Sequence, residues 1–311
     1  MKARGKAIFG AAGLAFALAL APSARAADTL TVCLDESIPI YSVHHGQESK
    51  GFDLAVAQAV AKRLGRALKV QWFESKLDED ASTTLAANAL LSDGRCELVA
   101  GYPLLGDALG KPGAPTARMP DFDGAKPDDR RRRVALGTLV PSKPYHYAPL
   151  TVVLGGSAAA KHILSLADLD GVKIGVESGT LADAILMVFD NGRLVNRITH
   201  LVPGRGKLLS QMDAGNFDAT LIDLRRFDAY RAEHPNTKLK ASGYYHRIGF
   251  NMGFVGLATE AGLIGQVNQA IADMQAKSEF ASLADAAGMT YVPPHQPDVL
   301  EHLSLADIYR N

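Results

Sequence analysis

The sequence predicts an α/β protein built from two lobes that are joined by two crossings of the chain. Apolar strand patterns alternate with helix patterns almost throughout, which favours layered α/β architecture over a β-sandwich or a helical bundle. A compact strand–helix series fills residues 150–240, and strand-rich segments flank it on both sides. The chain is therefore expected to cross between the lobes near residues 146–151 and 242–249. A length of 311 residues is sufficient for two such domains.

The first 26 residues have the composition of a secretory signal peptide. A basic start precedes an apolar run over residues 7–21, and Ala24-Arg25-Ala26 forms a small-x-small cleavage site. The apolar run is shorter than the ~20 residues that a membrane-spanning helix needs, so we expect cleavage after Ala26 rather than an anchor. The mature protein is then expected to be soluble outside the cytoplasm. Because basic and acidic residues both number 33, the balanced charge gives no reason to expect a nucleic-acid partner.

The elements of the first lobe follow from apolar periodicity. Val56, Val60 and Leu64 lie four residues apart on one stripe of the first helix, and Gly65 is suited to end it. The predicted strands are 29–34, 68–73 and 96–102, and the predicted helices are 51–65 and 83–94.

Residues 103–129 interrupt this alternation. They are rich in Gly, Pro and Asp and have no sustained period, so we interpret them as a long surface excursion. The sequence leaves open whether this segment is disordered or forms a lid. Strand patterns resume over 130–140 and 147–155.

The second lobe continues the alternation, and two helices close the chain before a proline-containing tail. Ser165 and Asp168 have the spacing of a capping box at a short helix. We expect strands at 172–178, 197–204 and 217–223, helices at 180–192, 207–215 and 224–235, and closing helices at 260–276 and 278–287. The predicted domains are the signal peptide 1–26, lobe 1 from 27–147 plus 245–311, and lobe 2 from 148–244.

Cys33 and Cys96 are the two cysteines of the chain. In an oxidising compartment an even count of two indicates one disulfide, and both lie beside predicted strands of the same lobe. Closing a loop of roughly 60 residues contributes ~4 kcal/mol in the chain-entropy model. The histidines have no metal-binding spacing, so we expect no metal site and no cofactor.

The stretch Ser178-Gly179-Thr180 carries a strand directly into a helix. Such a start presents unpaired backbone N–H groups and the positive end of the helix dipole, which suit a carboxylate. The alternative is that Ser178 or Thr180 only caps its own helix. The spacing fits neither a Gly-x-Ser-x-Gly nucleophile elbow nor a phosphate-binding loop.

Three further side chains are candidates for a polar ligand. Asp223 follows an apolar strand, where ligands of α/β sheets gather, and it suits an ammonium group or a helix N-cap. One arginine of the run "DDRRRR" has the geometry to hold a carboxylate bidentately if it faces a cleft, although a solvated run is the alternative. Tyr41, in the loop after the first strand, is placed to line a pocket or to pack in the core.

These segments together resemble the periplasmic solute-binding proteins of the polar amino-acid type, which deliver ligands to ABC importers. The resemblance covers nearly the whole mature chain. The resembling stretches are "LTVCLDESIPIYSV", "KGFDLAVAQAVAKRLG", "CELVAG", "RRRRVALGTLVPSKPYHY", "LADLDGVKIGVESGT" and "MDAGNFDATLID". The chain departs from the family pattern at Ile40 and Tyr41, where Pro and Phe are usual, and at Pro127, where Thr is usual.

The resemblance implies a type II periplasmic binding fold: each lobe has a mostly parallel sheet flanked by helices, and the ligand sits between the lobes. Arg130 would hold a carboxylate from one lobe and residues 178–180 from the other, while Asp223 would meet an amino group and Tyr41 would stack on the ligand. The expected ligand-binding residues are Asp35, Tyr41, Arg130, Ser178, Gly179, Thr180 and Asp223.

The implied function is capture of a small polar solute, an amino acid or a related carboxylate, by a monomer that delivers it to an ABC permease and catalyses no reaction. Two alternatives stay open. The cysteine pair and "GRCELVAGYP" resemble binding proteins associated with quinoprotein, methanol-type dehydrogenases, in which a periplasmic dehydrogenase would be the partner. A dehydratase-like enzyme on the same fold is the other alternative.

Overall fold

A computed structural model describes residues 28–36, 38–46, 48–75, 83–129, 132–204 and 207–309. The signal-peptide prediction for residues 1–26 and the predicted carboxylate ligand Arg130 lie outside these residues. Within the described part of the chain, no helix has the length and apolar character needed to cross a membrane.

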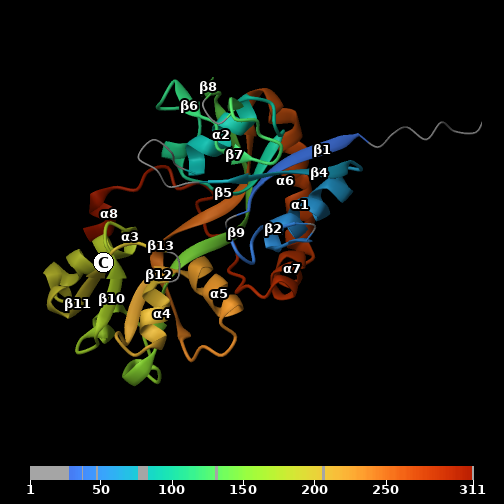
Figure 1. Cartoon of the computed structure of the whole chain (residues 1–311). Helices are drawn as coiled ribbons and strands as arrows, with labels where there is room; N and C mark the ends of the chain where they lie inside the picture. Colours follow the sequence, from blue (N-terminus) through green and yellow to red (C-terminus); the bar gives the residue numbers. More distant parts are fainter. Residues whose placement is uncertain are drawn as a thin grey trace, which may run out of the picture.

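One nine-stranded sheet runs through the molecule and is flanked by helices (Figure 1). Its strand order is β11-β10-β12-β9-β13-β5-β1-β4-β7. On either side of β9 and β13 the pairings are mostly parallel: β1 pairs with β4 and β5, and β10 pairs with β11 and β12, whereas the edge strand β7 is antiparallel to β4. The strands span Thr29–Asp35 (β1), Ala67–Glu74 (β4), Leu98–Pro103 (β5), Asp121–Phe122 (β7), Leu139–Leu154 (β9), Ile174–Glu177 (β10), Ile198–Leu201 (β11), Ala219–Asp223 (β12) and Lys240–Leu257 (β13).

Two long antiparallel strands, β9 and β13, join the two halves of the sheet. β13 pairs with β5 of the first half, and β9 pairs with β12 of the second half. The crossings predicted at residues 146–151 and 242–249 fall inside these two strands. The two-lobed α/β fold class is thereby confirmed. We call the half with β1, β4 and β5 lobe 1 and the half with β10, β11 and β12 lobe 2; their exact bounds stay a prediction.

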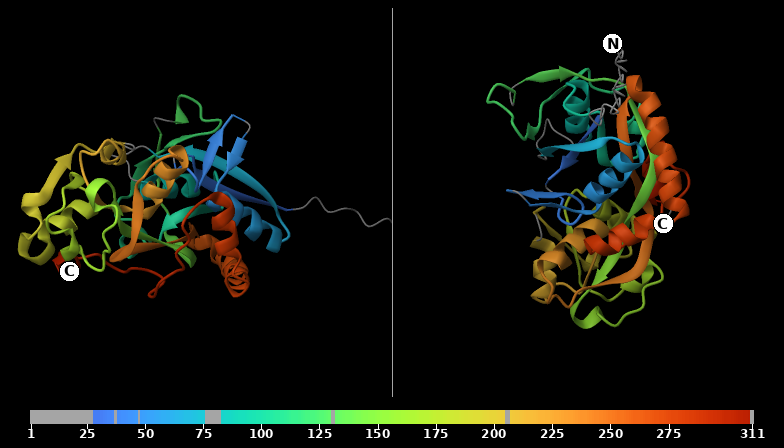
Figure 2. Two further views of the ribbon diagram at one scale, coloured as in Figure 1. Left: turned by 90° about the horizontal axis from the view of Figure 1, so that it is seen from below. Right: turned by 90° about the vertical axis from the view of Figure 1, so that its right-hand side faces the viewer.

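The helices α1 to α7 follow the predicted order, and α8 lies in the segment predicted as a tail. In lobe 1, α6 lies along β9 and packs against α1 and α7 (Figure 2). The helices span Phe52–Arg63 (α1), Thr83–Ser92 (α2), Leu181–Val188 (α3), Lys207–Asp213 (α4), Leu224–Glu233 (α5), Ala261–Ala276 (α6), Glu279–Ala287 (α7) and Leu305–Tyr309 (α8).

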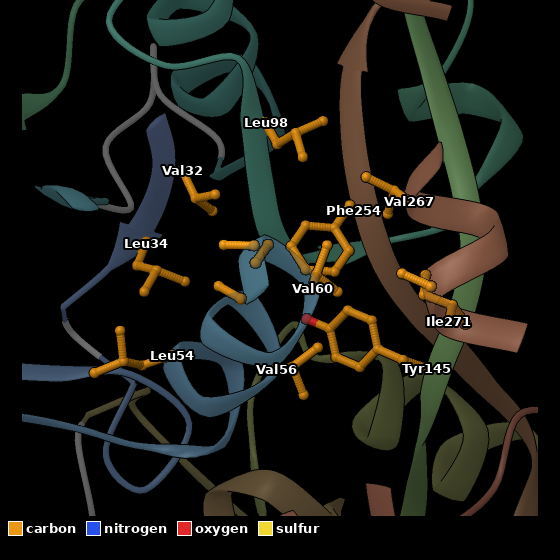
Figure 3. Packing of buried hydrophobic residues seen from close by; sticks show 14 of the residues in the cluster. Val32, Leu34, Leu54, Val56, Val60, Leu98, Tyr145, Phe254, Val267 and Ile271 are labelled. Carbon is orange, nitrogen blue, oxygen red and sulfur yellow. The ribbon is translucent and has the colours of Figure 1, made fainter. Parts of the chain in front are cut away.

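Each lobe has its own hydrophobic core. In lobe 1, Val56 and Val60 of the predicted apolar stripe point from α1 toward Phe254 and Tyr145 of the long strands (Figure 3). In lobe 2, Ile174 and Leu221 of the sheet pack with Ile185 of α3. Separate cores joined by two strands allow each lobe to keep its shape if the lobes rotate relative to each other.

The disulfide predicted from the cysteine count is confirmed. Cys33 on β1 is bonded to Cys96, which lies just before β5, with an S–S distance of 2.02 Å and a Cα–Cα distance of 5.7 Å. It fastens two neighbouring parallel strands of lobe 1 whose cysteines are 63 residues apart in sequence.

The segment 103–129 has regular structure in short pieces. β6 (Thr116–Arg118) pairs with β8 (Arg133–Ala135), and β7 pairs with the edge of β4. Met119 and Phe122 are buried in lobe 1. Strands of two or three residues are too short to show a period, so the sequence pattern gave no sign of them.

The final residues, 289–309, form a segment that we call the C-terminal strap. It leaves α7 in lobe 1, follows the hinge, and ends with α8 beside α3 of lobe 2 (Figures 1 and 2). Val292 and Ile308 are buried against side chains of the second half of the molecule. The strap was predicted as part of lobe 1, whereas its side chains also pack on lobe 2.

Asn251 on β13 fixes the middle of the strap. Its side-chain amide donates to the carbonyl oxygens of His295, Pro297 and Asp298 at 2.6, 3.0 and 3.0 Å, and its oxygen accepts from the His295 N–H at 3.0 Å. Asn251 itself is only 5% exposed.

We expect Asn251→Ala to lower the free energy of unfolding by about 2 kcal/mol, because it leaves several partly buried strap groups without partners. Urea unfolding measures the change. Gln269→Ala, which removes an exposed amide from α6, is the matched control and should change stability by less than about 0.5 kcal/mol. Equal effects of the two substitutions would show that the amide network does not stabilise the strap.

Candidate ligand-binding site

The predicted site residues of lobe 1 lie at the end of β1 and in the loop after it. Asp35 is 6% exposed, and its carboxylate accepts a hydrogen bond from the Ser75 hydroxyl. The Ser42 hydroxyl donates to the Asp35 carbonyl oxygen, which ties the loop back to the strand.

Tyr41 is buried in an aromatic group rather than presented to solvent. Its ring centroid lies 5.7 Å from that of His146 and 6.4 Å from that of Phe52, the latter edge-on. The loop is held against Gly51, which has φ of 133° and whose added Cβ would lie 2.3 Å from the Tyr41 carbonyl oxygen. Only glycine fits at position 51 for this reason.

The Ser178–Thr180 stretch caps α3. The Thr180 side chain accepts from the Asp183 N–H at 3.2 Å, and the Asp183 carboxylate accepts from the Gly179 N–H at 2.9 Å. The Ser178 N–H donates to the Leu201 carbonyl oxygen. The capping alternative is therefore seen in the structure, and a ligand contact at this helix start stays a prediction.

Asp223 also caps a helix, and in addition it forms an ion pair. Its carboxylate accepts from the backbone N–H of Arg225 at 2.9 Å and from the Arg225 guanidinium through Nε at 3.1 Å and Nη2 at 2.7 Å. Burial alone raises the pKa of Asp223, but the charge and hydrogen bonds of Arg225 outweigh it, and the net pKa is lowered.

Two arginines of the basic run are described, and both bind to the surface of lobe 1. The Arg132 guanidinium donates to Asp93 at 2.5 Å, and Arg133 donates to the hydroxyl and the carbonyl of Thr116, each at 3.1 Å. Neither is brought to Asp223 or Tyr41.

Sequence reasoning missed a buried network beside Tyr41. The Tyr145 hydroxyl donates to Asp53 Oδ1 at 2.7 Å and accepts from the Gly101 N–H at 2.6 Å. Burial raises the pKa of Asp53 to about 6, although the Tyr145 hydrogen bond and the charge of Arg225 act in the opposite direction. Asp53 lies within the Gly-Phe-Asp segment, but nothing in that pattern signals its partner 92 residues away.

His146 and Arg226 were missed as well. His146 is 1% exposed, and neither ring nitrogen has a well-formed hydrogen bond to the part of the chain that the structure describes. Burial, together with the charge of Arg225, lowers the pKa of His146 to about 3, so its ring is neutral at pH 7. Arg226 pairs bidentately with Glu177 at 2.5 and 2.9 Å, directly before the Ser178 stretch.

Comparisons with known proteins identify the fold. No family model and no curated protein matches the sequence. Among solved structures, the L-cystine solute receptor of Neisseria gonorrhoeae, in its unliganded open conformation, is similar with 19% identity and a TM-score of 0.58. That match covers 86% of this chain and 96% of the receptor. Substrate-binding domain 2 of GlnP from Lactococcus lactis, also open, is similar with 18% identity and a TM-score of 0.57, covering 84% and 97% of the two chains.

A histidine kinase sensor domain with similarity to periplasmic binding proteins is similar at 13% identity with a TM-score of 0.51, and 86% of this chain and 99% of that one are covered. At such identities the likeness shows the fold. The chain has the two-lobed fold of the periplasmic binding proteins, and the same fold serves solute receptors and a sensor domain.

Proposed function

We propose that this protein captures a small polar solute between its two lobes and delivers it to an ABC permease of the inner membrane. The observation that carries the proposal is the construction of the hinge: two lobes with separate cores are joined by β9 and β13. Candidate polar residues follow the carboxyl ends of β1, β10 and β12, where ligands of α/β sheets bind. Closure of the lobes around the solute needs no covalent chemistry, so no catalytic residue is proposed.

The structural likeness to the cystine receptor and the GlnP domain supports this function over the dehydrogenase-accessory and dehydratase alternatives. Periplasmic location after cleavage of residues 1–26 and a monomeric state belong to the same proposal. The proposed contacts are those of Asp35, Tyr41, Arg130, Asp223 and the 178–180 stretch.

A thermal-shift screen of the mature protein with amino acids, organic acids and sugars tests the proposal. A solute that binds the folded protein at 100 times its Kd raises the stability by about 2.7 kcal/mol, which is visible as a rise in Tm. Calorimetry on the hits then gives the affinity. Failure of every compound to raise Tm would count against solute capture.

For a solute found in this way, we expect Arg130→Ala to weaken binding about 10-fold or more, because a carboxylate would lose its charged partner. Arg132→Ala is the matched control, since Arg132 is bound to Asp93 on the surface of lobe 1. Similar Kd values for the two variants would remove Arg130 from the site.

Asp223→Asn is expected to weaken binding about 10-fold or more as well, because it removes a charge of the proposed site. Asparagine retains the side-chain oxygen that caps α5, so the effect on folding is small compared with that of alanine. An unchanged Kd would exclude Asp223 from the ligand site.

A further inference from the structure

The Asp223 carboxylate, which would accept from a ligand's ammonium group, is already paired with another residue of the protein. Both carboxylate oxygens of Asp223 accept hydrogen bonds from Arg225: Oδ1 from its backbone N–H, and Oδ2 from Nη2 at 2.7 Å. Nε of the same guanidinium is shared between Oδ1 and Oδ2 at 3.2 and 3.1 Å. A bidentate arginine–carboxylate pair is among the strongest of protein ion pairs, so an ammonium group would have to displace it.

The Arg225 guanidinium extends from α5 of lobe 2 to the hinge. Its Nη1 atom lies 3.9 Å from the sulfur of Met252, which is paired in register with His146 across β13 and β9. The positive charge of Arg225 also acts on Tyr41 and Asp53 of lobe 1. Arg225 is thus placed where the two lobes meet, with 23% of its side chain exposed to solvent.

Two donor groups at this position have only weak acceptors. A thioether sulfur is a weak acceptor, and it is the partner that Nη1 has among the described residues. His146, beside Met252, is buried and its neutral ring offers one N–H without a well-formed partner in the described part of the chain. Of the nearby carboxylates, Asp53 is bound to Tyr145, and Asp228 is bound to Arg231 and Thr290.

We propose that Arg225 sets the class of the captured solute: a carboxylic acid that carries no positively charged amino group. Arg225 is paired with Asp223, so an α-ammonium group at this position would lie beside a guanidinium whose own counter-charge is already bound. The carboxylate of the solute instead accepts from the Nη1 side of Arg225. This inference rests on the proposed function, and it makes Arg225 a specificity-determining residue of the same site.

Matched ligand pairs test this assignment, because the members of each pair differ only in the α-amino group. The probes are glutarate against L-glutamate, succinate against L-aspartate, and 4-methylpentanoate against L-leucine, each measured by thermal shift and calorimetry. For the wild-type protein we expect at least one acid to bind, about 10-fold or more tightly than its amino-acid partner, since an unpaired desolvated charge is costly. This measurement uses the wild-type protein alone, so its outcome does not depend on whether a variant folds.

Arg225→Met supplies the second arm. Methionine retains an unbranched side chain at this position and frees the Asp223 carboxylate, so the preference should shift toward the amino acid about 10-fold or more. Arg193→Met is the matched control, because Arg193 pairs with Asp170 and Asp190 on the surface of lobe 2, and it should leave the preference unchanged.

Tighter binding of L-glutamate, L-aspartate or L-leucine than of its partner by the wild-type protein would overturn the inference and leave solute capture standing. An unchanged preference in Arg225→Met would also overturn it. If no member of any pair and no compound of the wider screen binds, solute capture itself fails, and the assignment of Arg225 fails with it.

Discussion

Replacing Cys33 and Cys96 together by alanine is expected to lower the free energy of unfolding by about 4 kcal/mol. The disulfide closes a loop between positions 63 residues apart, and a loop of this length gives a stabilisation of about 4 kcal/mol through the entropy of the unfolded chain. Both cysteines are buried in the core between β1 and β5, so the alanines also remove some packing.

Urea unfolding of the double variant, compared with the wild-type protein with and without dithiothreitol, measures the effect. The reduced wild-type protein should match the double variant to within about 1 kcal/mol, because the sulfur atoms alone contribute little packing. A loss below about 1 kcal/mol in both cases would show that the bridge adds little to what the parallel β1–β5 pairing already provides.

The second large effect is a dependence of stability on pH that depends on Asp53. Burial raises the pKa of this carboxyl from 3.8 to about 6, so the folded protein binds the proton more tightly than the unfolded chain does. Stability is therefore highest below pH 4 as far as this group is concerned, and it falls as the pH rises to about 6. A difference of about two pKa units corresponds to about 3 kcal/mol.

Asp53→Asn removes this titration but retains an oxygen that accepts from the Tyr145 hydroxyl. Relative to the wild-type protein, the variant should gain about 3 kcal/mol in unfolding free energy between pH 4 and pH 7. Asp285→Asn, at an exposed position of α7, is the control and should show no such gain. If the unfolding free energies of Asp53→Asn and the wild-type protein change with pH in the same way, burial of the charged Asp53 carboxylate costs no stability.

Local pattern was enough to predict the longer strands and helices and the disulfide, but not the short strands β6 and β7 or the last helix α8. The stripe of Val56 and Val60 marks α1 because neighbouring turns of one helix share a face. The alternation of strands and helices predicted the two-lobed α/β architecture because each strand–helix pair lies within a short stretch of the chain.

The polar interior was not predictable in this way. Tyr145 meets Asp53 across 92 residues, and Arg226 meets Glu177 across 49, so no local spacing connects either pair. Arg225 was overlooked because a basic residue early in a helix is usually solvated, whereas here it folds back onto the residue that caps the helix. The contacts of the strap with lobe 2 were not foreseen for the same reason: one of its partners, Asn251, is 44 residues away from His295.

The C-terminal strap has a consequence for any motion of the lobes. The described chain starts at Asp28, beside β1 in lobe 1, and its last helix rests on lobe 2 (Figure 1). A swing of one lobe away from the other must either detach α8 from α3 or pull α8 along with lobe 2. Fluorescent dyes at positions 28 and 309 would therefore distinguish a strap that detaches from one that travels with lobe 2.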